Sequence, residues 1–405
     1  QLLKKYPDIY VNIEAGMSGD DSVTDTDALK VLNTEIMAGT GPDVLLLDGI
    51  SEDTYIERGM LEDLSGVLKD EDILPNIKDA YTKEDGSIYT MPVKFGIPMI
   101  EGNKDIIAGI TDLTTEADAA ESQKDSYGKL KFFSSFSISP SWLIQGTIDN
   151  STPAWMNEDG TLKEDALKEY LEVNRIWQTQ KDAIEETKKA YQMGDDWANS
   201  DRSGYTNIAG SITDLLVKVN TVAAGGLLSP EGLVYLDSAK KVDPDLDYRL
   251  LNGQSENCFY PRSIVGISAK ASEKEAAEKF VKFLFEEESQ RASNDEGLAV
   301  NSKVYEDMAY WKMGKSSGDT IGSIETSYDT GDGNIKQLEM DEIIPEDEAI
   351  QNIMDLGKTL TVPAKSNQII RSAVTESGEK YLNGETGLDD AVKEIMQEVN
   401  LYLSE

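Results

Sequence analysis

Side chains that could catalyse a reaction are scarce in this chain of 405 residues. It contains no histidine, which is the commonest general base and the commonest metal-ligating side chain. Its one cysteine, Cys258, has no partner for an intramolecular disulfide, and a lone thiol is more often a small core residue than a nucleophile. Catalytic triads and zinc sites built on imidazole are therefore excluded. We expect no enzymatic activity, no cofactor and no bound metal.

Carboxylates are the one abundant group with catalytic or metal-binding chemistry. Asp and Glu number 76, so pairs of the kind used by glycoside-cleaving enzymes arise by chance, and no pattern singles one out. Oxygen ligands also gather at Asp329, Asp332 and Asn334, and at Asn157 and Asp159. Neither group has the spacing of the twelve-residue calcium loop. We interpret both as solvated loops, and a glycosidase is the main enzymatic alternative.

Polar and small residues that could hold a ligand follow predicted strands. Asp48 and Ser51 come just after the apolar run 44–47, at the edge where open α/β sheets present ligands. A solvated loop or a helix cap is the alternative for both. Gly226 lies in the segment AAGGL (223–227), whose small residues let the backbone approach a ligand closely. A plain turn explains that segment equally well.

Tryptophans are candidates for stacking on the apolar face of a ligand ring. Trp142 follows a proline-broken segment, SPS (139–141), which makes it the best placed, with core burial as the alternative. Trp177 falls on a predicted helical stripe and is interpreted as core. Trp155 and Trp197 have polar neighbours, and both interpretations stay open for them.

Length and composition bound the architecture. A chain of 405 residues exceeds the size at which one hydrophobic core stops growing, so two domains or two lobes are expected. Hydrophobic residues make up 39% and charged residues 28%, as in soluble globular proteins. The formal net charge of -38 repels nucleic acid and anionic lipid, so neither is an expected partner.

The first part of the chain alternates between strand and helix patterns. Residues 10–14 (YVNIE) alternate with period two, and a helical pattern follows from Asp25 to Ala38, where Gly39 is placed to end the helix. The apolar run 44–47 is typical of a parallel strand buried on both faces. Together these segments predict a right-handed strand, helix, strand unit.

The remaining segments predict further elements. EDGS (84–87) indicates the turn of a hairpin over 84–93, and the prolines of 92–98 indicate a crossing between lobes. Apolar periodicity predicts helices from Leu162 to Trp177 and from Leu388 to Leu403, and SEKE (272–275) predicts a capping box that opens another helix. The polar segment 316–348 is interpreted as a long surface loop.

Four separated stretches resemble the extracellular solute-binding proteins of ABC sugar importers, the group that includes maltose-binding protein. They are LNTEIMAGTGPDV (32–44) with YIERGMLEDL (55–64), DGSIYTMPV (85–93) with NKD (103–105), GISAK (266–270) with AAEKFVKFL (276–284), and YLNG (381–384) with LYLSE (401–405). Each stretch is weak by itself, but their order and spacing span almost the whole chain. Most are markers of the fold and say little about the ligand.

The resemblance implies an α/β fold with two lobes and a hinge, the type II periplasmic-binding-protein-like fold. The amino-terminal lobe is expected to comprise residues 1–97 and 262–303, and the carboxy-terminal lobe residues 98–261 and 304–405, the last part helical. In this family a solute in the cleft stabilises the closed form, which the membrane permease subunits recognise. We expect a monomer that captures a carbohydrate and releases it unchanged.

The resemblance also places candidate residues in the two hinge crossings. Lys94, Phe95 and Gly96 occupy the first crossing, where family members often contact ligand, and hinge packing is the alternative for Phe95. Tyr260 and Arg262 occupy the second crossing, and Arg262 either bonds a ligand hydroxyl or carboxylate or bridges the lobes. Within the same fold, a peptide, a polyamine or another small polar solute is the alternative ligand.

The beginning of the chain departs from the family pattern. It starts QLLKKYP, without a methionine or a signal peptide, whereas family members normally have an earlier strand whose following loop often touches ligand. We expect an export signal and a lipid anchor in upstream sequence, and a location at the extracellular face of the membrane or in the periplasm. No apolar run approaches the roughly 18 residues that span a bilayer.

Overall fold

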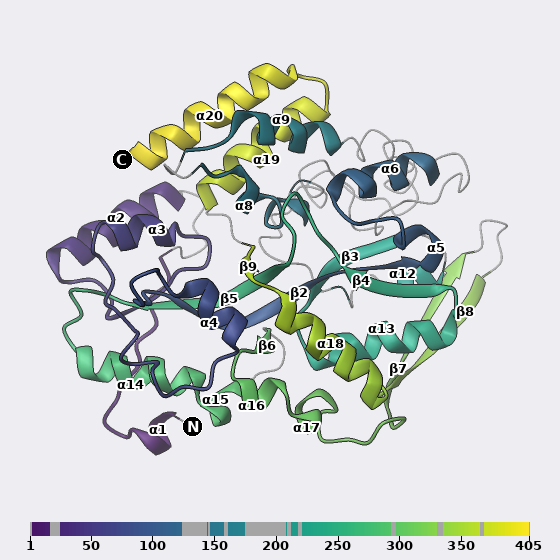
Figure 1. Ribbon diagram of the computed structural model, residues 1–405, viewed down its shortest axis with the longest axis horizontal. Coiled ribbons are helices and arrows are strands. Elements are labelled where there is room, and N and C mark those ends of the chain that lie inside the picture. Colours follow the sequence, from purple (N-terminus) through teal and green to yellow (C-terminus); the bar gives the residue numbers. More distant parts are fainter. Residues whose placement is uncertain are drawn as a thin grey trace.

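The computed structural model combines one long, mostly antiparallel sheet with helices on both of its faces (Figure 1). It describes residues 2–16, 25–123, 144, 146–157, 161–174, 208, 212–217, 221–292, 297–329, 335–364 and 368–404. The candidate stacking residue Trp142 lies outside these residues, as do Trp177 and Trp197. None of the described helices combines the length and the apolar character that crossing a membrane requires.

The described chain contains both strands and helices along its whole length. The strands are β1 (Val44–Leu46), β2 (Met91–Asn103), β3 (Val222–Leu227), β4 (Leu246–Leu250), β5 (Cys258–Ile267), β6 (Leu298–Ala299), β7 (Thr320–Asp329), β8 (Ile335–Ile343) and β9 (Val362–Pro363). The helices are α1 (Leu2–Lys5), α2 (Asp25–Ala38), α3 (Glu52–Glu57), α4 (Pro75–Tyr81), α5 (Lys104–Ile107), α6 (Leu113–Gln123), α8 (Thr152–Trp155), α9 (Glu164–Val173), α12 (Ile212–Leu216), α13 (Pro230–Val242), α14 (Lys274–Phe285), α15 (Glu287–Gln290), α16 (Ser302–Tyr305), α17 (Met308–Trp311), α18 (Asp347–Thr359), α19 (Gln368–Leu382) and α20 (Leu388–Ser404).

Strand β2 is the spine of the sheet and changes partners along its length. Its first half, from Met91 to Gly96, pairs antiparallel with β5, and Lys94 and Phe95 also pair with β6. From Ile97 onward it pairs with β3, and its last residues pair with β4 on the other edge. Strands β1 and β9 lie beyond β5, and β9 runs parallel to it. The predicted crossing segment is therefore a continuous strand that connects two groups of neighbours.

Alternation along β2 separates two apolar cores. Phe95, Ile97 and Met99 belong to the larger cluster, which includes residues of α4, α13, α14 and α18, whereas Ile100 belongs to a second cluster built from α6, α9, α19 and α20. Because successive side chains of a strand point to opposite faces, one strand supplies both cores. Figure 1 shows the consequence, with α13 and α18 on one face of the sheet and α19 and α20 on the other.

The predicted parallel unit at the start of the chain is wrong. Residues 10–14 form no strand in the part of the chain that the structure describes, and Tyr10 is 96% exposed. Strand β1 pairs antiparallel with β5, and Leu46 is 64% exposed, so this strand is not buried on both faces. An alternating pattern is a local property, whereas a strand also needs a neighbouring edge that supplies hydrogen bonds. The ending of α2 is confirmed, because Gly39 has a φ of +72°.

Two predictions about turns and loops need correction. The turn before β2 forms, since the Gly86 N–H donates to the Lys83 carbonyl at 2.9 Å, but residues 88–90 form no strand and no hairpin follows. The segment 316–348 contains the paired strands β7 and β8 instead of one long loop. β8 packs on α13, where the Ile343 N–H donates to Ser238 Oγ and Met340 is buried. A two-stranded ribbon on the surface is polar on its outer face, and this polar composition is the reason that the segment was interpreted as a loop.

The terminal helix is predicted correctly, whereas the capping box of α14 is not formed. The cap comes from Asp43, whose Oδ1 accepts the N–H of Ser272 at 2.6 Å and that of Glu273 at 3.1 Å. Ser272 Oγ itself donates to the same oxygen at 3.2 Å, so it does not act as the capping acceptor. The helix is therefore tied to the turn before β1, which the local sequence could not reveal.

This cap gives a testable difference between two substitutions. Asp43→Ala removes the acceptor for the N–H groups of Ser272 and Glu273, and we expect a loss of about 1 to 2 kcal/mol in the free energy of unfolding, measured by urea denaturation. Ser272→Ala removes an exposed hydroxyl and its 3.2 Å bond to Asp43 but leaves both backbone bonds, and we expect a loss below about 0.5 kcal/mol. Equal losses in the two variants would favour the capping box over the Asp43 cap.

Candidate functional site

Three predicted site residues meet where β2 changes partners. Gly96 is paired with Tyr260 of β5, and two residues further on Pro98 is paired with Gly226 of β3, so these residues share one face of the sheet. A Cβ at Gly96 would lie 2.5 Å from Leu228 Cδ2, and a Cβ at Gly226 would lie 2.9 Å from the same atom. Both positions therefore require glycine while Leu228 rests on them. We call Gly96, Gly226, Leu228 and Tyr260 the junction.

Buried polar groups surround the hydroxyl of Tyr260. The Asn150 side chain is hydrogen-bonded to it, and burial raises the pKa of Tyr260, with the Asp149 carboxylate adding to the rise. Both carboxylate oxygens of Asp149 accept from Nη2 of Arg371, which lies in the first turn of α19. Asn150 Oδ1 and, one helical turn beyond Arg371, Thr375 Oγ1 are buried with no hydrogen-bond partner. Since such groups cost about 1 to 3 kcal/mol each when unsatisfied, a ligand hydroxyl at either atom is stabilising.

A neutral carboxyl group lies near the same tyrosine. Glu116 of α6 is fully buried, and neither of its carboxyl oxygens has a hydrogen-bond partner. Desolvation raises the pKa of Glu116 to about 8, with the charge of Asp112 adding to the rise. The carboxyl is therefore protonated at pH 7, and it is close enough to Tyr260 to influence the ionisation of the phenol. As a neutral acid it can both donate and accept a hydrogen bond.

The loop after β1 contacts both β5 and α19. Asp48 accepts the N–H of Ser263 at 2.8 Å and the N–H of Ile264 at 2.9 Å. Desolvation raises the pKa of the Asp48 carboxyl, and these two bonds and the charge of Arg262 oppose the rise. The carbonyl of Gly49 accepts the N–H of Gln368, the first residue of α19, at 2.7 Å. The loop after β1 is thus joined to two segments that are far from it in the sequence.

Three other predicted residues have partners inside the fold and do not join the junction. Ser51 precedes α3, and its Oγ lies 2.8 Å from Thr54 Oγ1. Lys94 is buried and donates from Nζ to the Gln290 carbonyl at 2.6 Å. Phe95 is buried on the opposite face of β2 from Gly96, within the larger apolar cluster. For Ser51 the structure shows the alternative of a position at the start of a helix, and for Phe95 it shows the alternative of packing within the fold.

Trp155, which the sequence left undecided, is a core residue. Its side chain is fully buried, and its ring packs edge-on against Tyr170 with 4.8 Å between centroids. Its indole N–H donates to Gln254 Oε1 at 2.6 Å. The tryptophan is therefore fully used by the fold and leaves no face for a ligand.

Several residues of this region were missed by sequence reasoning. Arg371 carried a usable signal, because it is a charge on the apolar stripe that Ile370 and Val374 bury in α19, and charged residues are rarely buried unless paired. Asp149 and Asn150 follow no motif, and only their position beside Arg371 and Tyr260 identifies them.

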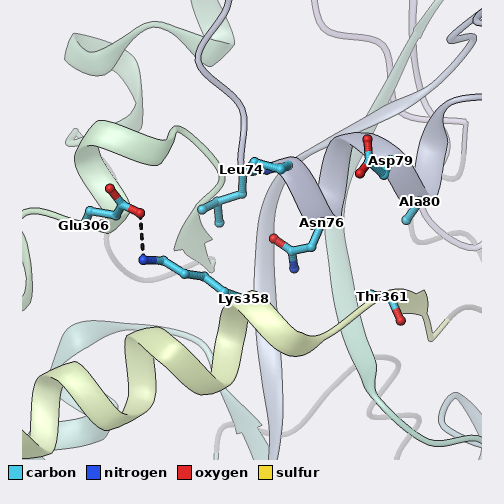
Figure 2. Close-up of a pocket in the computed structure, with 8 residues that line it drawn as sticks. Leu74, Asn76, Asp79, Ala80, Glu306, Lys358 and Thr361 are labelled. Carbon is cyan, nitrogen blue, oxygen red and sulfur yellow. Dashed lines mark ion pairs between the residues drawn. The ribbon is translucent and has the colours of Figure 1, made fainter.

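An open pocket of about 620 Å³ lies on the other face of β2 (Figure 2). Gly357, at the end of α18 beside this pocket, packs against Ile97, which faces away from Gly96. The polar groups of the pocket bind one another, since Lys358 pairs with Glu306 and Asn76 donates to the Gly357 carbonyl at 3.1 Å. We therefore place the candidate site at the junction. The pocket is lined by Leu74, Pro75, Asn76, Asp79, Ala80, Glu306, Lys358 and Thr361.

Comparisons with known proteins identify the family and the fold. The family model described as bacterial extracellular solute-binding protein matches residues 1–291. Comparison with curated protein sequences gives no match.

Among solved structures, maltose-bound MalE3 of T. maritima has a TM-score of 0.57 at 17% identity, over 99% of this chain and 94% of that one. An ABC substrate-binding protein of Listeria monocytogenes in complex with cycloalternan has a TM-score of 0.53 at 18% identity, over 100% and 94%. A protein from a study of xylan utilization by Caldanaerobius polysaccharolyticus has a TM-score of 0.56 at 15% identity, over 98% and 93%. At these identities the likeness shows the fold, which is that of two-lobed, type II α/β binding proteins.

Proposed function

The chain belongs to the family of bacterial extracellular solute-binding proteins, and on that premise we propose that it captures a carbohydrate between two lobes for an ABC importer. The lobes in this proposal comprise residues 1–97 with 262–303 and residues 98–261 with 304–405. The solute leaves chemically unchanged, and the closed form is the one that delivers it to the permease. The protein acts as an exported monomer, lipid-anchored at the extracellular face or free in the periplasm.

One observation carries the assignment of the site. The glycines 96 and 226 meet Tyr260 at the point where β2 changes partners, beside buried polar atoms that lack hydrogen-bond partners. A boundary between two packed bodies is where ligand sites preferentially form, and hydroxyl groups are the partners that Asn150 Oδ1 and Thr375 Oγ1 can use.

Hydrogen-bonding character and the known relatives support a neutral, hydroxyl-rich solute. The guanidinium of Arg371 is already paired with Asp149, and Glu116 is uncharged at pH 7, so the described groups around Tyr260 carry no net charge for an ionic ligand. Maltose and cycloalternan, the molecules bound by two of the relatives, belong to this class. We propose Asp48, Gly96 and Arg262 of the amino-terminal lobe and Gly226 and Tyr260 of the carboxy-terminal lobe as contacts, with Trp142 of the carboxy-terminal lobe as a stacking residue.

Closure of the two lobes in this proposal involves the loop after β1. The hydrogen bond from the Gln368 N–H to the Gly49 carbonyl joins the loop after β1 to α19, and Asp48 holds the same loop against β5. In our proposal the bond between Gln368 and Gly49 joins the two lobes and forms as they close, whereas the Asp48 contacts lie within the amino-terminal lobe. The solute adds the hydrogen bonds that favour the closed form.

A thermal-shift screen tests this function. A mono- or oligosaccharide at about 100 times its Kd adds about 2.7 kcal/mol to the stability of the native state and raises Tm by several degrees. We expect Asn150→Ala to weaken binding about tenfold through loss of one amide, whereas Asn157→Ala, an exposed turn amide, leaves Kd unchanged. A shift with peptides or polyamines and none with sugars would overturn the carbohydrate assignment. Chromatographic detection of cleaved oligosaccharide would overturn the binding-only function.

A further inference from the structure

Leu228 is a buried apolar side chain that belongs to no apolar core. It is 4% exposed, yet it is part of none of the hydrophobic clusters that the described residues form. Its neighbours at the junction are the backbone positions of Gly96 and Gly226 and the side chain of Tyr260.

The backbone holds this leucine firmly in position. Leu228 lies between the last residue of β3, Leu227, and Ser229, whose Oγ accepts the N–H of Gly232 and caps α13. A strand on one side and a capped helix on the other leave its main chain little freedom. The side chain therefore rests on the two glycines at a fixed place.

From this arrangement we infer that Leu228 sets the size of the solute group that can lie against the sheet at the junction. The inference rests on the proposed function. The side chain occupies the space above Gly96 and Gly226, and a ligand substituent directed there competes with its methyl groups. Leu228 is in this sense a specificity-determining residue, which excludes bulk without forming a polar bond.

The geometry predicts opposite effects for two substitutions. Leu228→Ala removes three carbon atoms above the glycines and leaves room for a larger substituent. Gly96→Ala places a Cβ 2.5 Å from Leu228 Cδ2, which forces the leucine side chain away from the sheet and, in the proposed site, toward the solute. General destabilisation moves both variants in the same direction, whereas a size selector moves them apart. Leu228→Met conserves volume and is the control.

Sugar pairs that differ only by hydroxymethyl groups provide the probes. They are D-xylose and D-glucose, L-arabinose and D-galactose, and xylobiose and cellobiose, titrated calorimetrically into the wild type and each variant after circular dichroism confirms folding. For the pair that binds, we expect Leu228→Ala to change the ratio of the two Kd values at least fivefold in favour of binding the larger sugar. We expect Gly96→Ala to shift it at least fivefold toward the smaller member, and Leu228→Met to leave it within twofold. Leu228→Val, with a smaller shift in the same direction, replaces the alanine variant if that variant does not fold.

The outcomes distinguish failure of this inference from failure of the proposed carbohydrate-binding function. If the wild type binds one of these sugars and the ratio is unchanged in both variants, or moves the same way in both, Leu228 is a packing residue and the inference fails alone. If the folded wild type binds none of them and no other carbohydrate, the proposed function fails and the inference fails with it.

Discussion

Replacing Arg371 with methionine is expected to lower the free energy of unfolding by about 3 to 5 kcal/mol. The guanidinium binds both carboxylate oxygens of Asp149, and both side chains are buried beside Tyr260. Removing the cation leaves the Asp149 carboxylate in a medium that solvates it poorly, and that uncompensated charge is the larger part of the loss. Urea unfolding at pH 7 measures it. The same variant is expected to weaken solute binding, because the carboxylate then reorganises next to the junction.

Two further variants separate the buried pair from a general effect of losing a charge on α19. Lys380, also on α19, forms an ion pair with Glu394 of α20, and both side chains are about half exposed, so Lys380→Met is expected to cost less than about 1 kcal/mol. Combining Arg371→Met with Asp149→Leu removes both charges and is expected to recover most of the stability. If the double variant is no more stable than Arg371→Met, the uncompensated charge is not the cause.

Replacing Glu116 with glutamine is expected to stabilise the protein by about 2 to 3 kcal/mol at pH 7. The folded-state pKa of Glu116 is raised from 4.5 to about 8 by desolvation, so the folded state keeps a proton that the unfolded state releases. Below pH 4.5 the group is protonated in both states and has no effect on stability. As pH rises from 4.5 to 8, ionisation of the unfolded chain lowers the stability of the wild type by up to about 1.4 kcal/mol per pH unit, and above pH 8 the loss levels off.

Glutamine keeps the shape and a neutral charge at every pH, so it removes this dependence. The difference between variant and wild type is expected to be near zero at pH 4.5 and to grow up to pH 8, measured as denaturation midpoints across that range. Glu101, also buried and with a raised pKa, contributes equally to both proteins and cancels in the difference. Glu121→Gln, at an exposed position of the same helix, is the control, with little change expected. A difference of the same size at pH 4.5 and pH 8 would show that titration of Glu116 is not its origin.

The family and the class of fold could be predicted from the sequence, because they depend on patterns spread over the whole chain. The turn before β1 with Asp43, the glycine that ends α2, and the apolar stripes of α9 and α20 are local features, and the structure contains each of them. Errors arose where a pattern was consistent with two environments. Leu46 and its neighbours were interpreted as a doubly buried strand, although one face of an edge strand meets solvent.

The candidate site was only partly accessible to the same reasoning. Gly96 and Tyr260 were predicted from two separate hinge crossings and Gly226 from a run of small residues, and only the register of β2 with β3 and β5 shows that they meet. Lys94 shares its segment with Gly96, yet its ammonium group is buried against the Gln290 carbonyl. Gln290 ends α15 and lies 196 residues further along the chain. Nothing in the neighbouring sequence indicates that Gly96 lies at the junction and Lys94 does not.

Composition and periodicity alone determined the exclusions and the building blocks: no imidazole chemistry, no expected affinity for nucleic acid, strands and helices enough for two cores. Tertiary structure alone decided which groups meet. The pairing of Asp149 with Arg371 and the position of Leu228 over Gly96 join residues that are 222 and 132 positions apart. Propensity and apolar spacing act over a few residues, whereas such contacts depend on strand register and on the burial of charge, which exist only once the whole chain has packed.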